Sequence, residues 1–241
     1  MGIIDETIAA IEPLDESARK TAKARLDSLT KPRGSLGYLE EIVECYAAIR
    51  HDGWATRKGE AIAVFVADHG IADEGVSAYP KAVTVEMLRN FARGGAAICV
   101  LARRFALDLV VVDVGVATDT RMENLPGVTY RRVAPGTVSF IRGPAMERAQ
   151  VLSALETGIE IARMLAARGV TLIGIGEMGI GNSTSAAALL SALSGIPPAK
   201  IAGFGSGLDD AGLRRKIALI EHGLKLHRAS LGDGVSLLAA L

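Results

Sequence analysis

The stretch Val170-Thr-Leu-Ile-Gly-Ile-Gly-Glu-Met-Gly-Ile-Gly-Asn-Ser-Thr184 joins a short apolar run to a cluster of glycines. The run from Val170 to Ile175 is too short for a helix and is typical of a strand covered on both faces. We expect a turn over Gly174 to Thr184 and a helix over the alanine-rich residues Ser185 to Leu193. Glycines let backbone N–H groups approach an anion closely, and the positive dipole end of the following helix favours a phosphate. The stretch therefore predicts a binding site for a phosphate-bearing small molecule.

Other short apolar runs along the chain predict further strands of the same sheet. They are Ala61 to Ala67, Leu109 to Val114 and, more weakly, Lys200 to Phe204. Longer segments with helical signals separate them, the clearest being Ala145 to Arg168, with Pro144 before it and Gly169 after it. This alternation predicts an α/β fold with a doubly wound, mostly parallel sheet flanked by helices. Ligands of such folds bind outside the carboxyl ends of the strands.

The N-terminal part of the chain has a different pattern. Residues 5 to 50 are predicted to be helical, with Asp15 and Ser35 as N-caps of two segments. We expect residues 1–55 to contribute a helical segment to a small domain. Residues 56–241 are expected to form the α/β core that binds the ligand.

Charge and composition exclude several classes of function. Lys and Arg total 27 and Asp and Glu total 27, so the chain lacks the basic excess that nucleic acid or an anionic membrane selects. Cys45 and Cys99 have no spacing typical of a disulfide framework or a zinc site, and the four histidines show no metal-binding pattern. These spacings predict no metal site. No basic region precedes an apolar run at the N-terminus, so we expect a cytoplasmic protein.

The glycine cluster permits other interpretations. Gly174-x-Gly176-x-x-Gly179 matches the dinucleotide fingerprint, but no carboxylate lies about 20 residues further on to hold the ribose. An NAD(P)-dependent oxidoreductase is therefore disfavoured, and no P-loop motif is present. An ordinary tight turn with Asn182 or Ser183 as the N-cap is the structural alternative.

Glu177 lies in the middle of the cluster, where a phosphate would repel its charge. In a glycosyl-transfer site that charge could face the positive charge that develops on a ribosyl carbon. An exposed loop glutamate is the alternative. We consider three functions: a phosphoribosyltransferase, an oxidoreductase, and a module that only binds a nucleotide.

Two further loops are expected at the same sheet edge. Gly203 to Asp210 leads into a helix with Arg214, Arg215 and Lys216, one of which could complete the charge around a phosphate. Asp68 to Pro80 combines carboxylates and a histidine with Tyr79, whose ring could contact a flat ligand.

Taken together, these segments resemble the nicotinate-nucleotide:dimethylbenzimidazole phosphoribosyltransferase family, which makes the lower-ligand riboside of cobalamin. The resemblance spans essentially the whole chain, in the order of the family's motifs. The residues that carry it are Leu29 to Gly37, Ala67 to Gly70, Glu74 to Pro80, Val83 and Thr84, Asn90 to Ala97, Val112 to Gly115, and Gly176 to Thr184.

The resemblance implies a homodimer that transfers the phosphoribosyl group of nicotinate mononucleotide to dimethylbenzimidazole or a related azole, without a cofactor. It implies that Glu177 lies beside the reacting ribose. The donor would be bound by Gly176, Gly179, Gly181, Asn182, Ser183, Thr184, Gly205 and Lys216, and the acceptor by Ser77, Tyr79 and Met87.

The family's general base is a glutamate in a loop beyond residue 241. The apolar ending from Gly234 to Leu241 is typical of a helix without a C-terminal cap. We therefore expect a fragment of a longer protein with weak or no activity, because loss of a general base typically costs about 10²- to 10⁴-fold.

Overall fold

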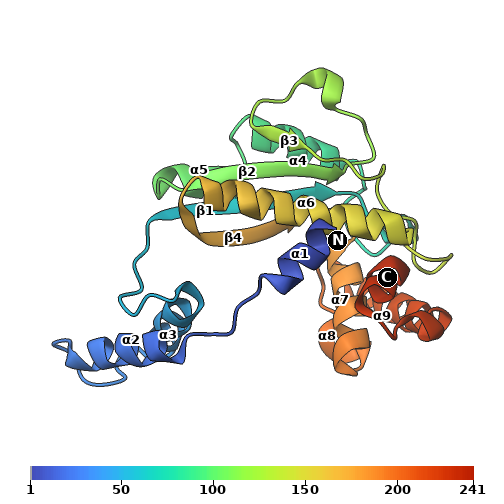
Figure 1. Cartoon of the computed structure of the whole chain (residues 1–241). Coiled ribbons are helices and arrows are strands. Elements are labelled where there is room, and N and C mark those ends of the chain that lie inside the picture. The colour runs from blue at the N-terminus through green and yellow to red at the C-terminus, as the bar shows by residue number, and fades with distance from the viewer. Residues whose placement is uncertain (1) are drawn as a thin grey trace. The chain divides into compact units, whose positions relative to one another are not determined.

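The computed structural model describes residues 2–241 (Figure 1). Contacts between Cα atoms divide the chain into two compact units, Met1–Glu60 with Ala166–Leu172, and Ala61–Leu165 with Ile173–Leu241. In chain order the elements are α1 (Ile3–Ala9), α2 (Glu16–Ser28), α3 (Tyr38–Arg50), β1 (Gly59–Ala67), η1 (Gly70–Glu74), α4 (Val83–Ala92), α5 (Ala97–Arg104), β2 (Asp108–Gly115), η2 (Arg121–Glu123), β3 (Val128–Tyr130), α6 (Arg148–Ala167), β4 (Val170–Met178), α7 (Asn182–Ser194), α8 (Pro198–Ile201), α9 (Asp210–Leu226), η3 (Arg228–Ser230) and α10 (Gly234–Ala240).

The sheet has the strand order β3-β2-β1-β4, and β1 pairs in parallel with β2, as does β2 with β3. The chain leaves the central strand β1 in one direction through α4 and α5, and it returns past β1 through α6. Because crossover connections between parallel strands are right-handed, opposite directions put the helices on opposite faces. Figure 1 shows this arrangement, with α6 on one face and α4 and α5 on the other. The predicted doubly wound α/β fold is confirmed.

One core of the second unit lies between the sheet and helices α4 and α5. Val64, Val66 and Val111 point from the strands toward Leu88 and other apolar residues of the helices. A separate core forms among α7, α9 and α10, where Phe140 is almost fully buried. A Cβ at Gly223 of α9 would overlap the Phe140 ring, so a glycine is needed for this close packing.

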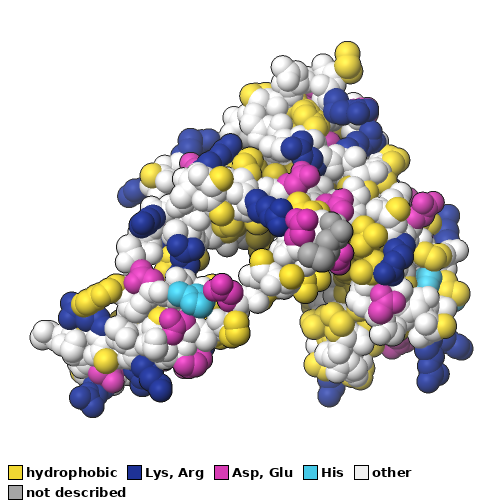
Figure 2. Space-filling model, viewed as in Figure 1, with side chains coloured by type: hydrophobic (Ala, Val, Ile, Leu, Met, Phe, Trp, Pro, Cys, Tyr) yellow, Lys and Arg dark blue, Asp and Glu magenta, His cyan; other side chains and the backbone are white. Residues whose placement is uncertain are grey.

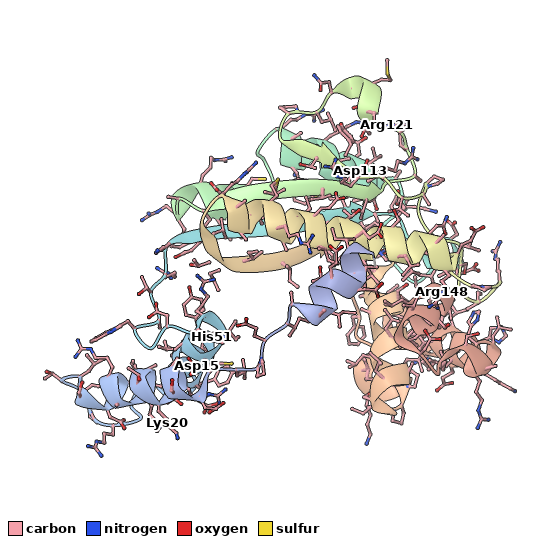
Figure 3. All side chains as sticks on the ribbon, in the orientation of Figure 1. Asp15, Lys20, His51, Asp113, Arg121 and Arg148 are labelled. Carbon is pink, nitrogen blue, oxygen red and sulfur yellow. The ribbon has the colours of Figure 1, made fainter. Side chains whose placement is uncertain are left out.

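In the first unit, α2 and α3 pack against each other through small side chains. Ala18 and Ala22 are buried on α2, and Ala47 is buried on α3. The predicted N-cap Asp15 is confirmed, because its Oδ1 accepts hydrogen bonds from the N–H groups of Ser17 and Ala18. Figure 3 shows His51, at the end of α3, beside this carboxylate.

The predicted N-cap Ser35 is wrong. Helix α3 begins at Tyr38, and its N-cap is Gly37 with φ 55°. The preceding residues form turns, in which the Ser35 N–H donates to the Pro32 carbonyl. The carboxylate of Glu40 then accepts the Leu36 N–H at 3.1 Å, so a side chain from inside the helix replaces the expected cap.

Two other boundaries differ from the expectation. The segment Lys200 to Phe204 is not a strand, because Pro198 starts the short helix α8, which ends at Ile201. Helix α6 begins at Arg148 and not after Pro144. The residues directly before it are not helical, because the Ala145 and Met146 N–H groups donate to carbonyls at the end of α10, a contact that local sequence does not reveal.

The surface carries both signs of charge, and Figure 2 shows basic and acidic side chains interspersed on the face it presents. No helix within residues 2–241 is both long and apolar enough to cross a membrane. These observations agree with the balanced composition.

Leu88 provides a test of the core beneath α4. Its side chain is fully buried, so we expect Leu88→Ala to lower the free energy of unfolding by about 2–5 kcal/mol through lost burial and a residual cavity. Leu101→Ala is the matched control, because Leu101 is half exposed on α5 and should change stability by about 0.5 kcal/mol or less. Urea unfolding of both variants measures the difference, and equal effects would contradict the packing.

Candidate functional site

A cavity of about 350 Å³ lies where β4 ends and α7 begins. Its walls come from three segments of the second unit. The first is the loop and helix from Val76 to Met87, the second is Glu177 to Ser183, and the third is Gly205 with Ser206. The cavity is at the carboxyl end of a strand, where ligands of doubly wound sheets bind.

Most of the expected site residues line this one cavity, although they lie far apart in the sequence. Those on its wall are Ser77, Tyr79, Met87, Glu177, Gly179, Gly181, Asn182, Ser183 and Gly205. Gly176, Thr184 and Lys216 do not line it. Gly176 lies inside β4, and Thr184 is fully buried, with its Oγ1 lacking a hydrogen-bond partner among the described residues.

The wall also includes residues that the sequence reasoning missed: Val76, Val83, Met178, Ile180 and Ser206. Val83 and Met87 are four residues apart on α4, so helical spacing alone could have paired Val83 with the expected Met87. Ser206 had no such signal. Its Oγ lies 2.7 Å from the Ser77 Oγ, a contact that joins two loops 129 residues apart.

The turn in the glycine-rich segment is shorter than expected. Strand β4 continues through Met178, so only Gly179, Ile180 and Gly181 separate it from α7. At two of these positions the backbone requires a glycine. A Cβ at Gly179 would overlap the Ala67 carbonyl and come within 3.0 Å of the His69 ring, and Gly181 has φ 95°.

Helix α7 starts without a side-chain cap on its first N–H groups. Asn182 and Ser183, the expected alternative caps, instead lie inside the helix and on the cavity wall. An uncapped helix start carries partial positive charge and attracts anions. The cavity therefore meets α7 at a point suited to a phosphate.

Lys216 brings a full positive charge to the same place. Its side chain projects from α9 and is fully buried, and its Nζ donates to the Ser183 Oγ at 2.8 Å and to the Gly203 carbonyl at 3.2 Å. Within residues 2–241 no carboxylate forms an ion pair with it. Burial lowers the pKa of Lys216, because a charged ammonium loses hydration there. A bound anion would supply the missing counter-charge.

Glu177 is on the wall of the cavity, near the end of β4 and directly before Met178. Surrounding protein atoms raise the pKa of this carboxyl by desolvation, and a hydrogen bond from the Asn182 side chain partly offsets the rise. The cavity thus has a carboxylate on its wall, and a buried ammonium group on another element contacts Ser183 of the same wall. A ligand that is anionic at one end and develops positive charge at the other matches this arrangement.

The opposite wall is largely apolar. Tyr79 is more than half exposed, and the loop that carries it is held by a hydrogen bond from the Tyr79 N–H to the Ser77 Oγ at 3.1 Å. Val83 and Met87 continue this wall along α4. Flat aromatic ligands bind well against such surfaces because ring and thioether atoms contact them over a large area.

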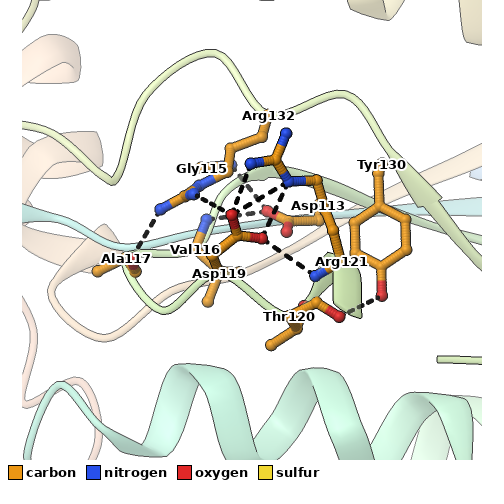
Figure 4. Close-up of polar contacts among 9 residues, drawn as sticks. All are labelled: Asp113, Gly115, Val116, Ala117, Asp119, Thr120, Arg121, Tyr130 and Arg132. Atoms are coloured by element: carbon orange, nitrogen blue, oxygen red, sulfur yellow. Dashed lines mark hydrogen bonds and ion pairs between the residues drawn. The ribbon is translucent and has the colours of Figure 1, made fainter. Parts of the chain in front are cut away.

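The Val112 to Gly115 motif has a structural role at the end of β2 (Figure 4). The Asp113 Oδ1 accepts hydrogen bonds from the N–H groups of Gly115 and Val116, and burial raises the pKa of this carboxyl. Arg132 donates to the Ala117 carbonyl at 2.7 Å and fixes the next part of the loop.

Within residues 2–241, no three His, Cys, Asp or Glu side chains come together as a metal site would need.

Comparison with known proteins identifies the family. The sequence model of a phosphoribosyltransferase family matches residues 11–241. A nicotinate-nucleotide–dimethylbenzimidazole phosphoribosyltransferase from Roseiflexus sp. (strain RS-1) is 46% identical over 239 residues, which are 99% of this chain and 67% of the relative. The chain belongs to this family. The corresponding enzyme from Azotobacter vinelandii is 48% identical over 98% of this chain and 67% of its own length.

Solved structures agree with the sequence comparison. A nicotinate-nucleotide–dimethylbenzimidazole phosphoribosyltransferase from Thermus thermophilus matches with a TM-score of 0.84 and 41% identity, over 94% of this chain and 66% of that chain. The family is one of pentosyltransferases, as the sequence resemblance implied. This chain spans about two thirds of the length of these relatives.

Gly179 and Gly176 form a matched pair for testing the turn of this family member. We expect Gly179→Ala to lower the free energy of unfolding by about 1–3 kcal/mol, because the methyl group would collide with the Ala67 carbonyl and the His69 ring. In Gly176→Ala the new Cβ would lie 3.7 Å from Val64, an ordinary contact, so stability should be unchanged or slightly higher. Thermal melts of both variants provide the measurement, and a stable Gly179→Ala protein would refute the packing.

His69 should make stability depend on pH in a defined window. Burial, with a smaller effect from the Lys81 ammonium, lowers the pKa of His69 from 6.5 to about 4. Between these values the unfolded chain binds a proton that the folded chain does not, so stability falls as the pH drops from 6.5 to 4. At about 1.4 kcal/mol per pKa unit, the loss should approach about 3 kcal/mol.

His69→Gln isolates this contribution, because a neutral side chain does not titrate. Urea midpoints at about pH 7.5 and about pH 4.5 should shift less in the variant than in the wild-type protein, since effects of other groups are common to both. An identical shift in the two proteins would show that His69 is protonated in the folded chain.

Proposed function

We propose that this chain binds nicotinate mononucleotide with its phosphate at the start of α7 and presents the ribose to an azole acceptor. The observation that carries the proposal is the buried Lys216 ammonium, which lacks a carboxylate partner within residues 2–241 and contacts Ser183 in the first turn of α7. A phosphate there would accept hydrogen bonds from the helix start and balance the charge. The names of the relatives support nicotinate mononucleotide as the donor.

In the proposed reaction the bond between the ribose C1′ and the pyridinium nitrogen breaks, and its electron pair leaves with nicotinate. A ring nitrogen of dimethylbenzimidazole, or of a related azole, forms the new bond to C1′ with its lone pair, and the other ring nitrogen then loses its proton. Glu177 would stabilise the positive charge that develops on the ribose as the first bond breaks. Ser77, Tyr79 and Met87 would hold the acceptor on the opposite wall of the cavity.

Donor binding tests this chain more directly than turnover, because it depends only on the cavity described above. We also propose that the chain acts in the cytoplasm as a homodimer, as the resemblance implies. Light scattering on the purified protein measures its oligomeric state.

A nicotinamide-dependent oxidoreductase is a poorer explanation of the same cavity. The dinucleotide fingerprint places its glycines in the turn that receives the pyrophosphate. Here Gly174 and Gly176 lie within β4, and only Gly179 of the fingerprint reaches the turn. A thermal-shift panel separates the functions, since nicotinate mononucleotide should stabilise the protein more than NAD does. Product formed with dimethylbenzimidazole, and lost in Glu177→Gln, would distinguish a transferase from a binding module.

Lys216→Met should weaken binding of nicotinate mononucleotide by about 10- to 100-fold, because a hydrogen bond to a charged group contributes about 1.5–3 kcal/mol. Lys200→Met removes an exposed lysine of α8 and is the control, with affinity expected within about twofold of wild type. Isothermal titration calorimetry measures both. If the two variants bind equally well, Lys216 does not contact the phosphate.

Binding should also weaken as the solution becomes alkaline. Burial lowers the pKa of Lys216 below its usual value of 10.5, so the ammonium loses its proton at a lower pH than an exposed lysine would. Affinity should fall as the pH rises toward 10.5, and this fall should be absent in Lys216→Met.

A further inference from the structure

Thr84 reaches the donor turn from a helix that otherwise forms the acceptor wall. It lies in the first turn of α4, its side chain is fully buried, and its Oγ1 accepts the Ile180 N–H at 3.1 Å. The two residues are 96 positions apart in the sequence. Ile180 is the middle residue of the turn between β4 and α7.

The hydrogen bond to Thr84 fixes the Ile180 peptide, because no carbonyl of the turn accepts its N–H. The Asn182 N–H donates back to the Gly179 carbonyl, and the Thr184 N–H donates to the Gly181 carbonyl. The Ile180 N–H instead points into the protein, and the Ile180 side chain is buried as well. A buried N–H group without an acceptor is costly, so its partner determines how the turn lies.

The same helix carries side chains on the cavity wall. Val83 precedes Thr84 directly, and Met87 lies one turn further along α4. Both side chains line the proposed acceptor subsite. A shift of α4 relative to the turn would therefore change the separation of donor and acceptor. Transfer between two bound molecules is sensitive to displacements of about 1 Å.

We infer that Thr84 is a positioning residue for phosphoribosyl transfer: its bond to the Ile180 N–H holds the donor turn against α4 and sets the distance between the two subsites. This inference rests on the proposed function, because it assigns the two walls to donor and acceptor. Thr84 is not among the residues of the cavity wall, so it would act through the turn and not by contact with a substrate.

The experiment compares three variants by titration calorimetry with nicotinate mononucleotide. Thr84→Val keeps the shape of the side chain but removes the acceptor, and the donor should bind about tenfold more weakly. Thr84→Ser restores a hydroxyl and should bind within about threefold of wild type. Thr157→Val is the control, because Thr157 is a buried threonine of α6 whose Oγ1 donates within its own helix, and its loss should leave donor binding unchanged.

Hydrogen exchange gives a second readout that does not depend on a ligand. The Ile180 amide should exchange slowly in the wild-type protein and in Thr84→Ser, and quickly in Thr84→Val. If Thr84→Val does not fold, Thr84→Ala removes the same acceptor without placing a methyl group against the N–H. Rescue by serine distinguishes positioning through the hydroxyl from a general loss of packing.

Donor binding by Thr84→Val as tight as that of the wild-type protein would overturn the inference and leave the proposed function intact. Rapid exchange of the Ile180 amide in the wild-type protein would also overturn the inference, without affecting the proposed function. A wild-type protein that does not bind nicotinate mononucleotide would overturn the proposed function, and this inference with it.

Discussion

The candidate site depends on how closely the turn after β4 approaches the end of β1. At Gly179 the backbone lies so near the Ala67 carbonyl and the His69 ring that no side chain fits between them. This contact joins the ends of two neighbouring strands, β1 and β4, and directs the chain into α7. It thereby helps to position Glu177, Asn182 and Ser183 on the cavity wall.

The electrostatics of the site follow from where α7 starts. Ser183 is in its first turn, and it receives a hydrogen bond from Lys216, which would otherwise have only a carbonyl as its partner. A buried ammonium is unfavourable without an anion, and a helix start without a side-chain cap attracts one. Folding therefore concentrates positive potential at one end of the cavity, while Glu177 provides negative charge elsewhere on its wall.

The structure gives a second reason why glycine occurs at some positions of the cluster. The glycine cluster by itself predicts close approach of a phosphate, yet Gly179 and Gly181 are also required by packing and by a positive φ. Gly174 and Gly176 are within the strand. The same residues thus satisfy a steric requirement of the fold, and Lys216 with the start of α7 is the stronger sign of an anion site.

The sequence by itself determined the alternation of strands and helices, the parallel sheet, the Asp15 cap and the family, because apolar periodicity, capping chemistry and ordered motifs are local properties of the chain. It also indicated most residues of the cavity wall. Only the tertiary structure decided that α6 starts at Arg148 and that Ser206 and Thr84 contact the site. The physical reason is that hydrogen bonds between residues far apart in the chain decide these features, and no local pattern records which partner a buried N–H or hydroxyl will find.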